Sequence, residues 1–403
     1  MIATLAGCSP ATAPRHLDPA LPWYGDNRER IDAFLDENAD ADAPVAVFDW
    51  DNTVIKNDVG DMMFYWMIAN DKVLQPPGRL WFETSPYMTA AGAAALGQAC
   101  DDVAEPGQPL PTSKPENVAC ADELLAGYDG TTTTGEAVFA DWNHRTMEPT
   151  YAWIVQLQAG YTPAEIRGFA DAAIDAALAA EPGAVQTVGS QTDLNAYIRI
   201  YDQIHDLIGT LQADGFDVWV LSASSQPVVE AFAARVSIDA DHVVGLRTVV
   251  GDDGKLTSEL QGCGGAERIT YIEGKRCWMN QEIFGVTGAD AAAIQTDTTR
   301  RPAFAAGDSD TDVAFLQDST GLKLVLNRNK KQLMCNAYND AGGNWLINPM
   351  FIEPKDQLTD GYACSVDACT NEAGDGVPCT DEHGDAIPDQ EDAVFCTDAG
   401  SCG

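Results

Sequence analysis

The chain has 403 residues, of which 62 are acidic and 23 basic, and its formal net charge is −39. A chain of this length can form two or three domains, each with its own buried core. Such a negative surface repels phosphate backbones, so we exclude DNA and RNA as partners. No apolar run approaches the ~20 residues that span a bilayer.

The eleven cysteines and the N-terminus suggest export. The sequence contains no CxxC pair of the kind that holds zinc, so we expect disulfides and an oxidising compartment. The segment Leu5-Ala-Gly-Cys8 resembles the lipobox of bacterial lipoproteins, although the apolar stretch before it is short for an export signal. We therefore expect a periplasmic or outer-surface protein with a lipid anchor at Cys8, a chance match being the alternative.

The N-terminal half predicts a linker, the first part of a parallel sheet and a helical insertion. Residues 1–21 contain the shortened signal and a Pro- and Ala-rich linker, and residues 44–48 are a short apolar run typical of a buried parallel strand. Residues 60–205 are predicted to be a helical cap, in which Thr162-Pro-Ala-Glu165 starts a helix and residues 100–135 are rich in loops. An additional helix is expected over residues 27–38.

The following part of the chain alternates strands and helices. This alternation predicts an α/β fold, a Rossmannoid parallel sheet made by residues 22–59 and 206–355 with the helical cap inserted between them. The expected elements are helices over 201–211 and 227–235, strands over 216–221, 302–306 and 323–326, and a small hairpin over 242–254.

Residues 356–403 are predicted to be a separate acidic, Cys-rich tail that is either disulfide-bonded or disordered. Five of the eleven cysteines lie between Cys364 and Cys402. Residues 379–392 resemble a thrombospondin type 3 calcium repeat, with His383 in place of a ligand aspartate, so Ca²⁺ binding and a solvated acidic tail are both open. Spacing alone does not fix the disulfides. Plausible local pairs are Cys100–Cys120, Cys263–Cys277, Cys369–Cys379 and Cys396–Cys402.

Four short segments carry residues suited to chemistry. They are Phe48-Asp-Trp-Asp-Asn-Thr53, Val220-Leu-Ser-Ala-Ser224, Gly274-Lys275 and Ala306-Gly-Asp-Ser-Asp-Thr-Asp312. Three of them follow predicted strands, and ligands of open α/β sheets bind at the carboxyl ends of strands. Carboxylates there suit Mg²⁺, and a lysine can offset charge in a transition state.

The order of these segments, DxDxT, hhhS, K and GDxxxD, resembles the motifs of haloacid-dehalogenase superfamily phosphatases, particularly the phosphoserine-phosphatase-like branch. The resemblance covers about residues 45–60 and 200–330. It implies that Asp49 is the nucleophile and that Asp51 is the general acid and then the base. It further implies that Thr53 and Ser222 hold phosphoryl oxygens and that Lys275 offsets their charge.

The resemblance also implies a metal site. Mg²⁺ would be held by Asp49, the carbonyl oxygen of Asp51 and Asp308. Asp312 would lie behind them and fix the metal waters or Lys275, and Asp310 is an alternative for this last role. The implied reaction is Mg²⁺-dependent hydrolysis of a small phosphomonoester through an aspartyl-phosphate.

Substrate choice in this superfamily belongs to the cap. Asp58 and Asp61 can face a cationic amine, and aromatic rings such as Trp66 can bind quaternary ammonium. As an exported enzyme with these motifs, the chain is similar to bacterial phosphorylcholine phosphatases, which makes phosphocholine or a phosphoserine-like ester the expected substrate. The alternatives are a non-catalytic surface lipoprotein that binds calcium or a partner, and phosphotransfer to an acceptor other than water. The cap aromatics considered are Tyr65, Trp66, Trp81, Tyr87, Trp142, Tyr151 and Trp153.

Overall fold

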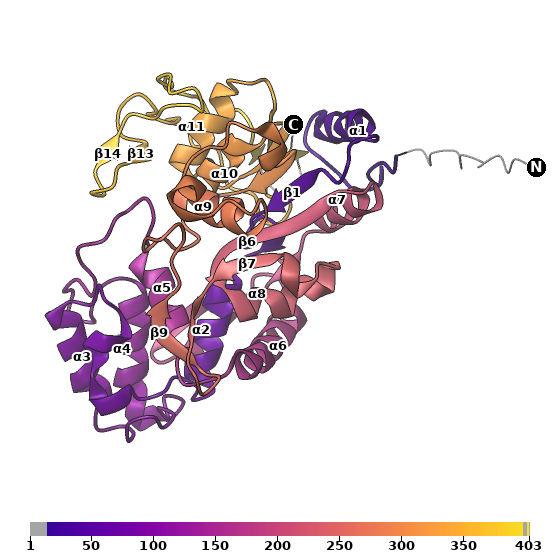
Figure 1. The fold of residues 1–403 in the computed structure, drawn as a ribbon. Coiled ribbons are helices and arrows are strands. Elements are labelled where there is room, and N and C mark those ends of the chain that lie inside the picture. The colour runs from indigo at the N-terminus through magenta and orange to yellow at the C-terminus, as the bar shows by residue number, and fades with distance from the viewer. Residues whose placement is uncertain (1–13, 398–400, 403) are drawn as a thin grey trace, which may run out of the picture.

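The centre of the molecule is a six-stranded, wholly parallel sheet with the order β12-β11-β10-β1-β6-β7. The computed structural model describes residues 14–397 and 401–402, so the predicted anchor at Cys8 lies outside the described residues. The α/β fold predicted from the sequence is confirmed (Figure 1). The strands of the sheet are β1 (Val45–Phe48), β6 (Asp217–Ser225), β7 (Val243–Leu246), β10 (Phe304–Gly307), β11 (Leu322–Asn327) and β12 (Trp345–Pro349).

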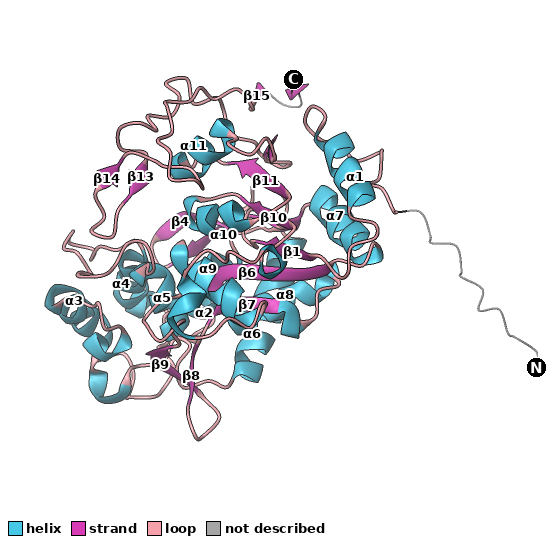
Figure 2. Ribbon diagram, turned by 45° about the horizontal axis from the view of Figure 1, so that its top comes forward, coloured by secondary structure: helices cyan, strands magenta, loops and turns pink. Residues whose placement is uncertain are grey.

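Helices cover both faces of this sheet, which explains why its strands are continuous apolar runs. One face packs on α1 (Asn27–Glu37), α7 (Asp202–Ala213) and α8 (Gln226–Ala233). The other packs on α9 (Glu273–Glu282), α10 (Val313–Asp318) and α11 (Lys331–Asn339). Figure 2 shows α1 and α7 on the side of the sheet away from α10. After β1, the chain adds β6 and β7 on one side of β1 and then β10, β11 and β12 on the other. The order in which strands are added therefore reverses at β1.

The sequence prediction was wrong about residues 242–254 and missed β12. Val243–Leu246 is not half of a hairpin; it is β7, the edge strand of the parallel sheet, paired with β6 across an irregular register. The hairpin begins immediately after it and consists of β8 (Thr248–Val250) and β9 (Leu256–Leu260). A four-residue apolar strand followed closely by a second strand has the same local pattern as one longer strand, so pairing partners decide the difference.

Five helices occupy the region predicted to be the cap. Figure 1 shows them grouped beyond the end of the sheet where α2 follows β1. The capping box at Thr162 and Glu165 starts α6 as predicted. The stretch 100–135 is less irregular than expected, because it contains α4, which the Cys100–Cys120 disulfide joins to α3. The helices are α2 (Val59–Ala69), α3 (Ala90–Cys100), α4 (Val118–Tyr128), α5 (Pro149–Gln156) and α6 (Pro163–Ala179).

Short strands complete this region and the tail. Among the described residues, no helix is long and apolar enough to cross a membrane. The remaining strands are β2 (Ile55–Lys56), β3 (Val185–Val188), β4 (Gln191–Asn195), β5 (Arg199–Ile200), β13 (Cys369–Thr370), β14 (Gly376–Val377), β15 (Cys396–Thr397) and β16 (Ser401–Cys402).

The described part of the tail is disulfide-bonded, which is one of the two expected alternatives, and it is joined to the core. The Cys335–Cys364 disulfide, which the sequence analysis did not propose, links it to α11. Asp392 is buried and accepts hydrogen bonds from Asn327 and Tyr338 at 3.0 and 2.7 Å. The predicted pairs Cys100–Cys120, Cys263–Cys277 and Cys369–Cys379 are confirmed. The backbone pairing of β15 and β16 sets position 396 opposite position 402.

The tail also contains an internal repeat that the sequence analysis missed. The segments 369–378, CTNEAGDGVP, and 379–388, CTDEHGDAIP, follow one another directly. The side-chain oxygens of Asn371 and Asp381 each accept hydrogen bonds from the backbone N–H groups two and four residues later. Each copy therefore folds into the same turn, which ends at a glycine with positive φ.

Candidate active site

The carboxyl ends of β1, β6, β10 and β11 converge on one cavity of about 190 Å³. This is the place where ligands bind in open α/β sheets, beside the strand at which the order changes direction. Its lining includes Asp49 and Asp51 after β1, Ser224 at the end of β6, Asp308 after β10 and Arg328 after β11.

Asp49 is held at both carboxylate oxygens. Its Oδ2 accepts a hydrogen bond from Thr53 Oγ1 at 3.0 Å, and its Oδ1 lies 2.6 Å from Lys275 Nζ. Burial and the nearby Asp312 raise the pKa of Asp49, whereas Lys275 opposes this effect. The ammonium group therefore favours the ionised carboxylate that a nucleophile requires.

Asp312 is the second partner of Lys275. Its Oδ1 lies 2.6 Å from Lys275 Nζ, and its Oδ2 accepts hydrogen bonds from the backbone N–H groups of Asp308 and Ser309 at 3.0 and 2.9 Å. A Cβ at Gly307 would lie 2.6 Å from the Cβ of Asp312, so only glycine fits there. Asp312 thus fixes Lys275. Asp310, the alternative to Asp312 for this role, accepts a hydrogen bond from the backbone N–H of Leu333 at the start of α11.

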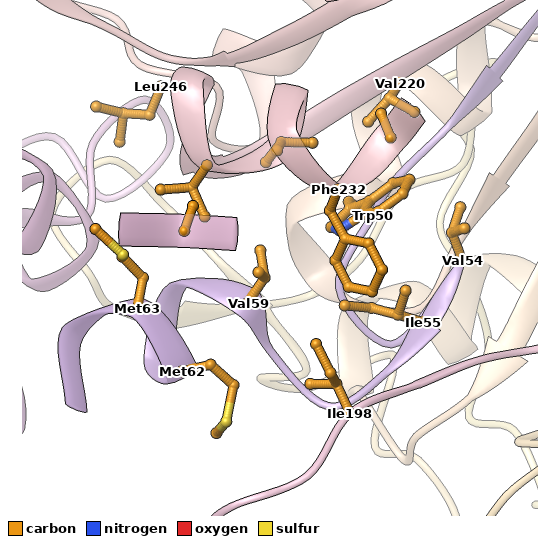
Figure 3. Packing of buried hydrophobic residues seen from close by; sticks show 14 of the residues in the cluster. Trp50, Val54, Ile55, Val59, Met62, Met63, Ile198, Val220, Phe232 and Leu246 are labelled. Carbon is orange, nitrogen blue, oxygen red and sulfur yellow. The ribbon is translucent and has the colours of Figure 1, made fainter. Parts of the chain in front are cut away.

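Asp51, two residues after Asp49, lines the same cavity. Its two oxygens accept hydrogen bonds from the backbone N–H of Val59 and from Ser224 Oγ, both at 2.7 Å. Trp50, between the two aspartates, is buried against Phe232 in the hydrophobic cluster of Figure 3. Burial and the nearby Asp58 raise the pKa of Asp51, which favours the protonated form that a general acid needs.

The buried carboxylates of Asp49, Asp308 and Asp312 form the group that fits a cation. Each offers one oxygen within 4.8 Å of the others. Oxygen ligands suit Mg²⁺. Because Asp49 and Asp308 line the cavity and Asp312 does not, Asp49 and Asp308 are the better ligands. Asp308 contacts Thr53 through Oδ1 and Arg328 through Oδ2.

Ser222, which was predicted to hold phosphoryl oxygens, does not line the cavity, whereas Ser224 does. Ser222 is fully buried, and its hydroxyl accepts a hydrogen bond from the backbone N–H of Ser224 at 3.0 Å. Ser224, which the sequence analysis did not name as a site residue, lines the cavity and holds Asp51. The structure therefore places Ser222 beneath the cavity floor and Ser224 at its surface.

The two acidic residues predicted to meet the substrate lie at the start of α2. Asp58 lines the cavity and caps the helix, since its Oδ1 accepts from the backbone N–H groups of Gly60 and Asp61. Asp61 accepts a hydrogen bond from the hydroxyl of Tyr128 at 2.5 Å. Burial and the neighbouring Asp58 raise the pKa of Asp61 to about 7.

The cap aromatics are distributed differently from the prediction. Trp66 packs on Phe169, with ring centroids 5.6 Å apart, and is not part of the cavity lining. Trp81 and Trp153 are buried core residues. The aromatic residues that line the cavity are tyrosines, namely Tyr128, Tyr151 and Tyr271, and Tyr151 alone belonged to the predicted set.

Arg328 and Lys330 are the cationic residues of the cavity lining that the sequence analysis missed. They follow β11 directly, and this strand was predicted. Applying the strand-end argument to the segment Asn327-Arg-Asn-Lys330 would have found them, as it found the groups after β1 and β10. Tyr128 and Tyr271 had no comparable signal, because they reach the cavity from a helix end and a loop.

Comparison with known proteins finds one family model that matches part of the chain. The sequence model of the haloacid dehalogenase-like hydrolases matches residues 124–317, which include Ser222, Lys275 and Asp308. A search among proteins of curated function finds no significant match.

Solved structures with a similar fold include a conserved, functionally unknown protein from Anaerococcus prevotii DSM 20548. It is 21% identical over 82% of this chain and 93% of its own, with a TM-score of 0.62. A protein of unknown function from Bordetella pertussis Tohama I is 16% identical over 77% of this chain and 100% of its own, with a TM-score of 0.44. A substrate-bound phosphoserine phosphatase is 13% identical over 70% of this chain and 86% of its own, with a TM-score of 0.32.

Residues 124–317 are thus similar in sequence to the haloacid dehalogenase-like hydrolases, and the parallel sheet brings Asp49, Lys275 and Asp308 together. Asp51 lines the same cavity as Asp49 and Asp308.

Proposed function

We propose that the protein hydrolyses a small phosphate monoester through an aspartyl-phosphate at Asp49, with Mg²⁺ as cofactor. The observation that carries this proposal is the placement of Asp49 between the Lys275 ammonium and the Thr53 hydroxyl, with Asp51 in the same cavity. These groups provide a nucleophile, charge compensation and a proton donor at one point.

The proposed reaction has two steps. An oxygen of Asp49 attacks phosphorus, the bond to the ester oxygen breaks, and the proton of Asp51 goes to the departing alcohol. Asp51, now ionised, then takes a proton from water as the water oxygen attacks phosphorus, which releases phosphate and restores Asp49. The raised pKa of Asp51 fits the first role, and its hydrogen bond from Ser224 fixes its direction for both.

The metal in this proposal belongs with Asp49 and Asp308, and the carbonyl oxygen of Asp51 is the third ligand that the family resemblance implies. When bound, Mg²⁺ offsets the charge of the phosphoryl oxygens. Lys275 remains with Asp49 and Asp312, and the Thr53 hydroxyl lies 3.0 Å from both Asp49 and Asp308. The chain itself therefore keeps the nucleophile oriented.

The proposed substrate has a cationic end. Asp58 and the rings of Tyr128, Tyr151 and Tyr271 line the cavity, and Asp61 is bonded to the Tyr128 hydroxyl. Carboxylates and aromatic faces together suit an ammonium group. Phosphocholine, phosphoethanolamine and phosphoserine are the candidates, and Arg328 and Lys330 favour the last because they can receive its carboxylate.

The proposal also includes export, a lipid anchor at Cys8 and calcium binding by the tail. The disulfides at Cys100–Cys120, Cys263–Cys277, Cys335–Cys364 and Cys369–Cys379 support an oxidising compartment. Calcium binding by the tail has less support, because Asp389 and Asp392 accept hydrogen bonds from protein groups.

Phosphate release from phosphocholine, phosphoethanolamine, phosphoserine and p-nitrophenyl phosphate tests the function. We expect release with Mg²⁺, its loss with EDTA, and its loss in Asp49→Asn. Asp252→Asn is the matched control, because Asp252 is exposed in the β8–β9 turn. Release that survives in Asp49→Asn would reject Asp49 as nucleophile, and no release from any substrate would favour the binding-protein alternative.

A further inference from the structure

We propose that Arg145 is a positioning residue through which the disulfide-bonded tail holds the helix that carries Lys275. Arg145 lies in the loop before α5, far from the catalytic segments in sequence. The proposal rests on the function proposed above for Lys275, and it gives the tail a part in catalysis.

Arg145 joins separate parts of the molecule. Its guanidinium forms a two-pronged ion pair with Glu273, in which Nε donates to Oε1 at 2.9 Å and NH2 donates to the same carboxylate. Its NH1 donates to Gln332 Oε1 at 2.8 Å and to the carbonyl oxygen of Thr370 at 3.1 Å. The side chain is 15% exposed, so these contacts are largely shielded from water. Arginine suits such a junction because its donors form a rigid planar fork.

Glu273 transmits this restraint to Lys275. It is the first residue of α9, two positions before the lysine, and its backbone N–H donates to the carbonyl oxygen of Arg145 at 3.1 Å. The residue before it, Ile272, has φ of 45°, which a β-branched residue rarely adopts. A strained turn persists when its surroundings hold it, and here Arg145 does so from both its main chain and its side chain.

The tail supports Arg145 from the other side. Thr370 lies in the loop closed by the Cys369–Cys379 disulfide. The same loop accepts a hydrogen bond from the backbone N–H of His144, through the carbonyl oxygen of Glu372 at 3.0 Å. Gly374 has φ of +89°, and a Cβ there would lie 2.8 Å from the His144 ring. Figure 1 shows the β13–β14 hairpin of this loop reaching from the tail toward the helical region.

The Arg145 junction affects the position of Lys275 at the reacting centre. Lys275 Nζ lies 2.6 Å from both Asp49 and Asp312, so a small shift of α9 would break one of these contacts. Misplacement of a catalytic group by about 1 Å can cost a hundredfold in rate. Loss of the Arg145 junction therefore acts on kcat more than on substrate binding.

The kinetic test compares Arg145→Gln, Arg145→Lys and a Cys369→Ser/Cys379→Ser double variant with p-nitrophenyl phosphate and Mg²⁺. We expect Arg145→Gln to lower kcat by about 10- to 100-fold with KM changed less than about threefold. We expect Arg145→Lys to recover part of the rate and the cysteine variant to lose about three- to tenfold. Arg167→Gln is the control, because it removes an arginine–glutamate ion pair with Glu230 away from the cavity and should keep the wild-type kcat.

A second measurement separates this proposal from the proposed function. Hydrogen–deuterium exchange of the wild type and the variants needs no substrate. We expect exchange to increase together over residues 143–147 and α9 in Arg145→Gln and in the cysteine variant, but not in Arg167→Gln. Unchanged exchange in α9, or a kcat within twofold of wild type in Arg145→Gln, would overturn the proposal. An inactive wild type with the expected exchange pattern would reject the proposed function and keep the structural link.

Discussion

At the scale of single residues, Lys275 is the most constrained group of the site. It is fully buried and paired with the carboxylates of Asp49 and Asp312. A buried charge of this kind is tolerated because its partners are fixed by backbone hydrogen bonds and by Thr53. The same arrangement that stabilises the lysine therefore also orients Asp49, the proposed nucleophile.

Removing this ammonium should damage both activity and stability. We expect Lys275→Met to lower kcat by at least about a hundredfold, because the phosphoryl charge loses its counterion. We expect the free energy of unfolding to fall by about 3–5 kcal/mol, because two buried carboxylates lose their partner. Urea unfolding and p-nitrophenyl phosphate kinetics measure the two effects. Wild-type kcat in a folded variant would rule out the assigned role.

Asp61 gives a prediction about pH. Its pKa is raised to about 7, and Asp58 and the Tyr128 hydroxyl face it. Because the folded protein holds this proton more tightly than the unfolded chain, ionisation costs stability as the pH rises from about 4 to 7. Asp61→Asn should therefore be more stable than wild type at pH 8, by about 1–2 kcal/mol, and this difference should vanish toward pH 4. Thermal unfolding across this range checks it, and a difference independent of pH would contradict the raised pKa.

At the scale of elements, strand ends determine the site. The apolar runs that became β1, β10 and β11 were recognisable, and the polar residues after the first two were predicted as site residues. The sequence could not show that Ser222 lies beneath Ser224 or that Trp66 packs on Phe169, because side-chain direction in the folded protein decides both. β7 and α4 were missed for a similar reason, since tertiary pairing and the packing of α3 on α4 stabilise them.

The close contact at the end of β10 is a test at this scale. We expect Gly307→Ala to displace Asp312, because the new Cβ would lie 2.6 Å from its Cβ. The expected loss is about 1–3 kcal/mol in stability and more than about tenfold in kcat. Gly168→Ala in α6 is the control, because no atom lies within 4 Å of its Cβ position, and it should be neutral or stabilising. Equal behaviour of the two variants would reject the packing argument.

At the scale of the whole molecule, the acidic charge around the cavity should make stability depend on Mg²⁺. A chain with a net charge of −39 buries several carboxylates around one cavity, and Asp308 there contacts Thr53 and Arg328. A ligand that binds the folded state stabilises it by mass action. We expect Mg²⁺ to raise the melting temperature in a saturable way and Asp308→Asn to abolish most of this rise. A rise that persists in the variant would place the stabilising ion elsewhere, for example in the acidic tail.

The central claim is covalent phosphorylation of Asp49, and acid-quenched mass spectrometry of Asp51→Asn during turnover tests it most directly. This variant lacks the base that activates water, so the phosphorylated enzyme should accumulate when p-nitrophenyl phosphate and Mg²⁺ are supplied. The account predicts a phosphoryl adduct on the peptide that contains Asp49, and no adduct when Asp49→Asn is added. An adduct on another peptide, or phosphate release by the wild type with no adduct in Asp51→Asn, would contradict it.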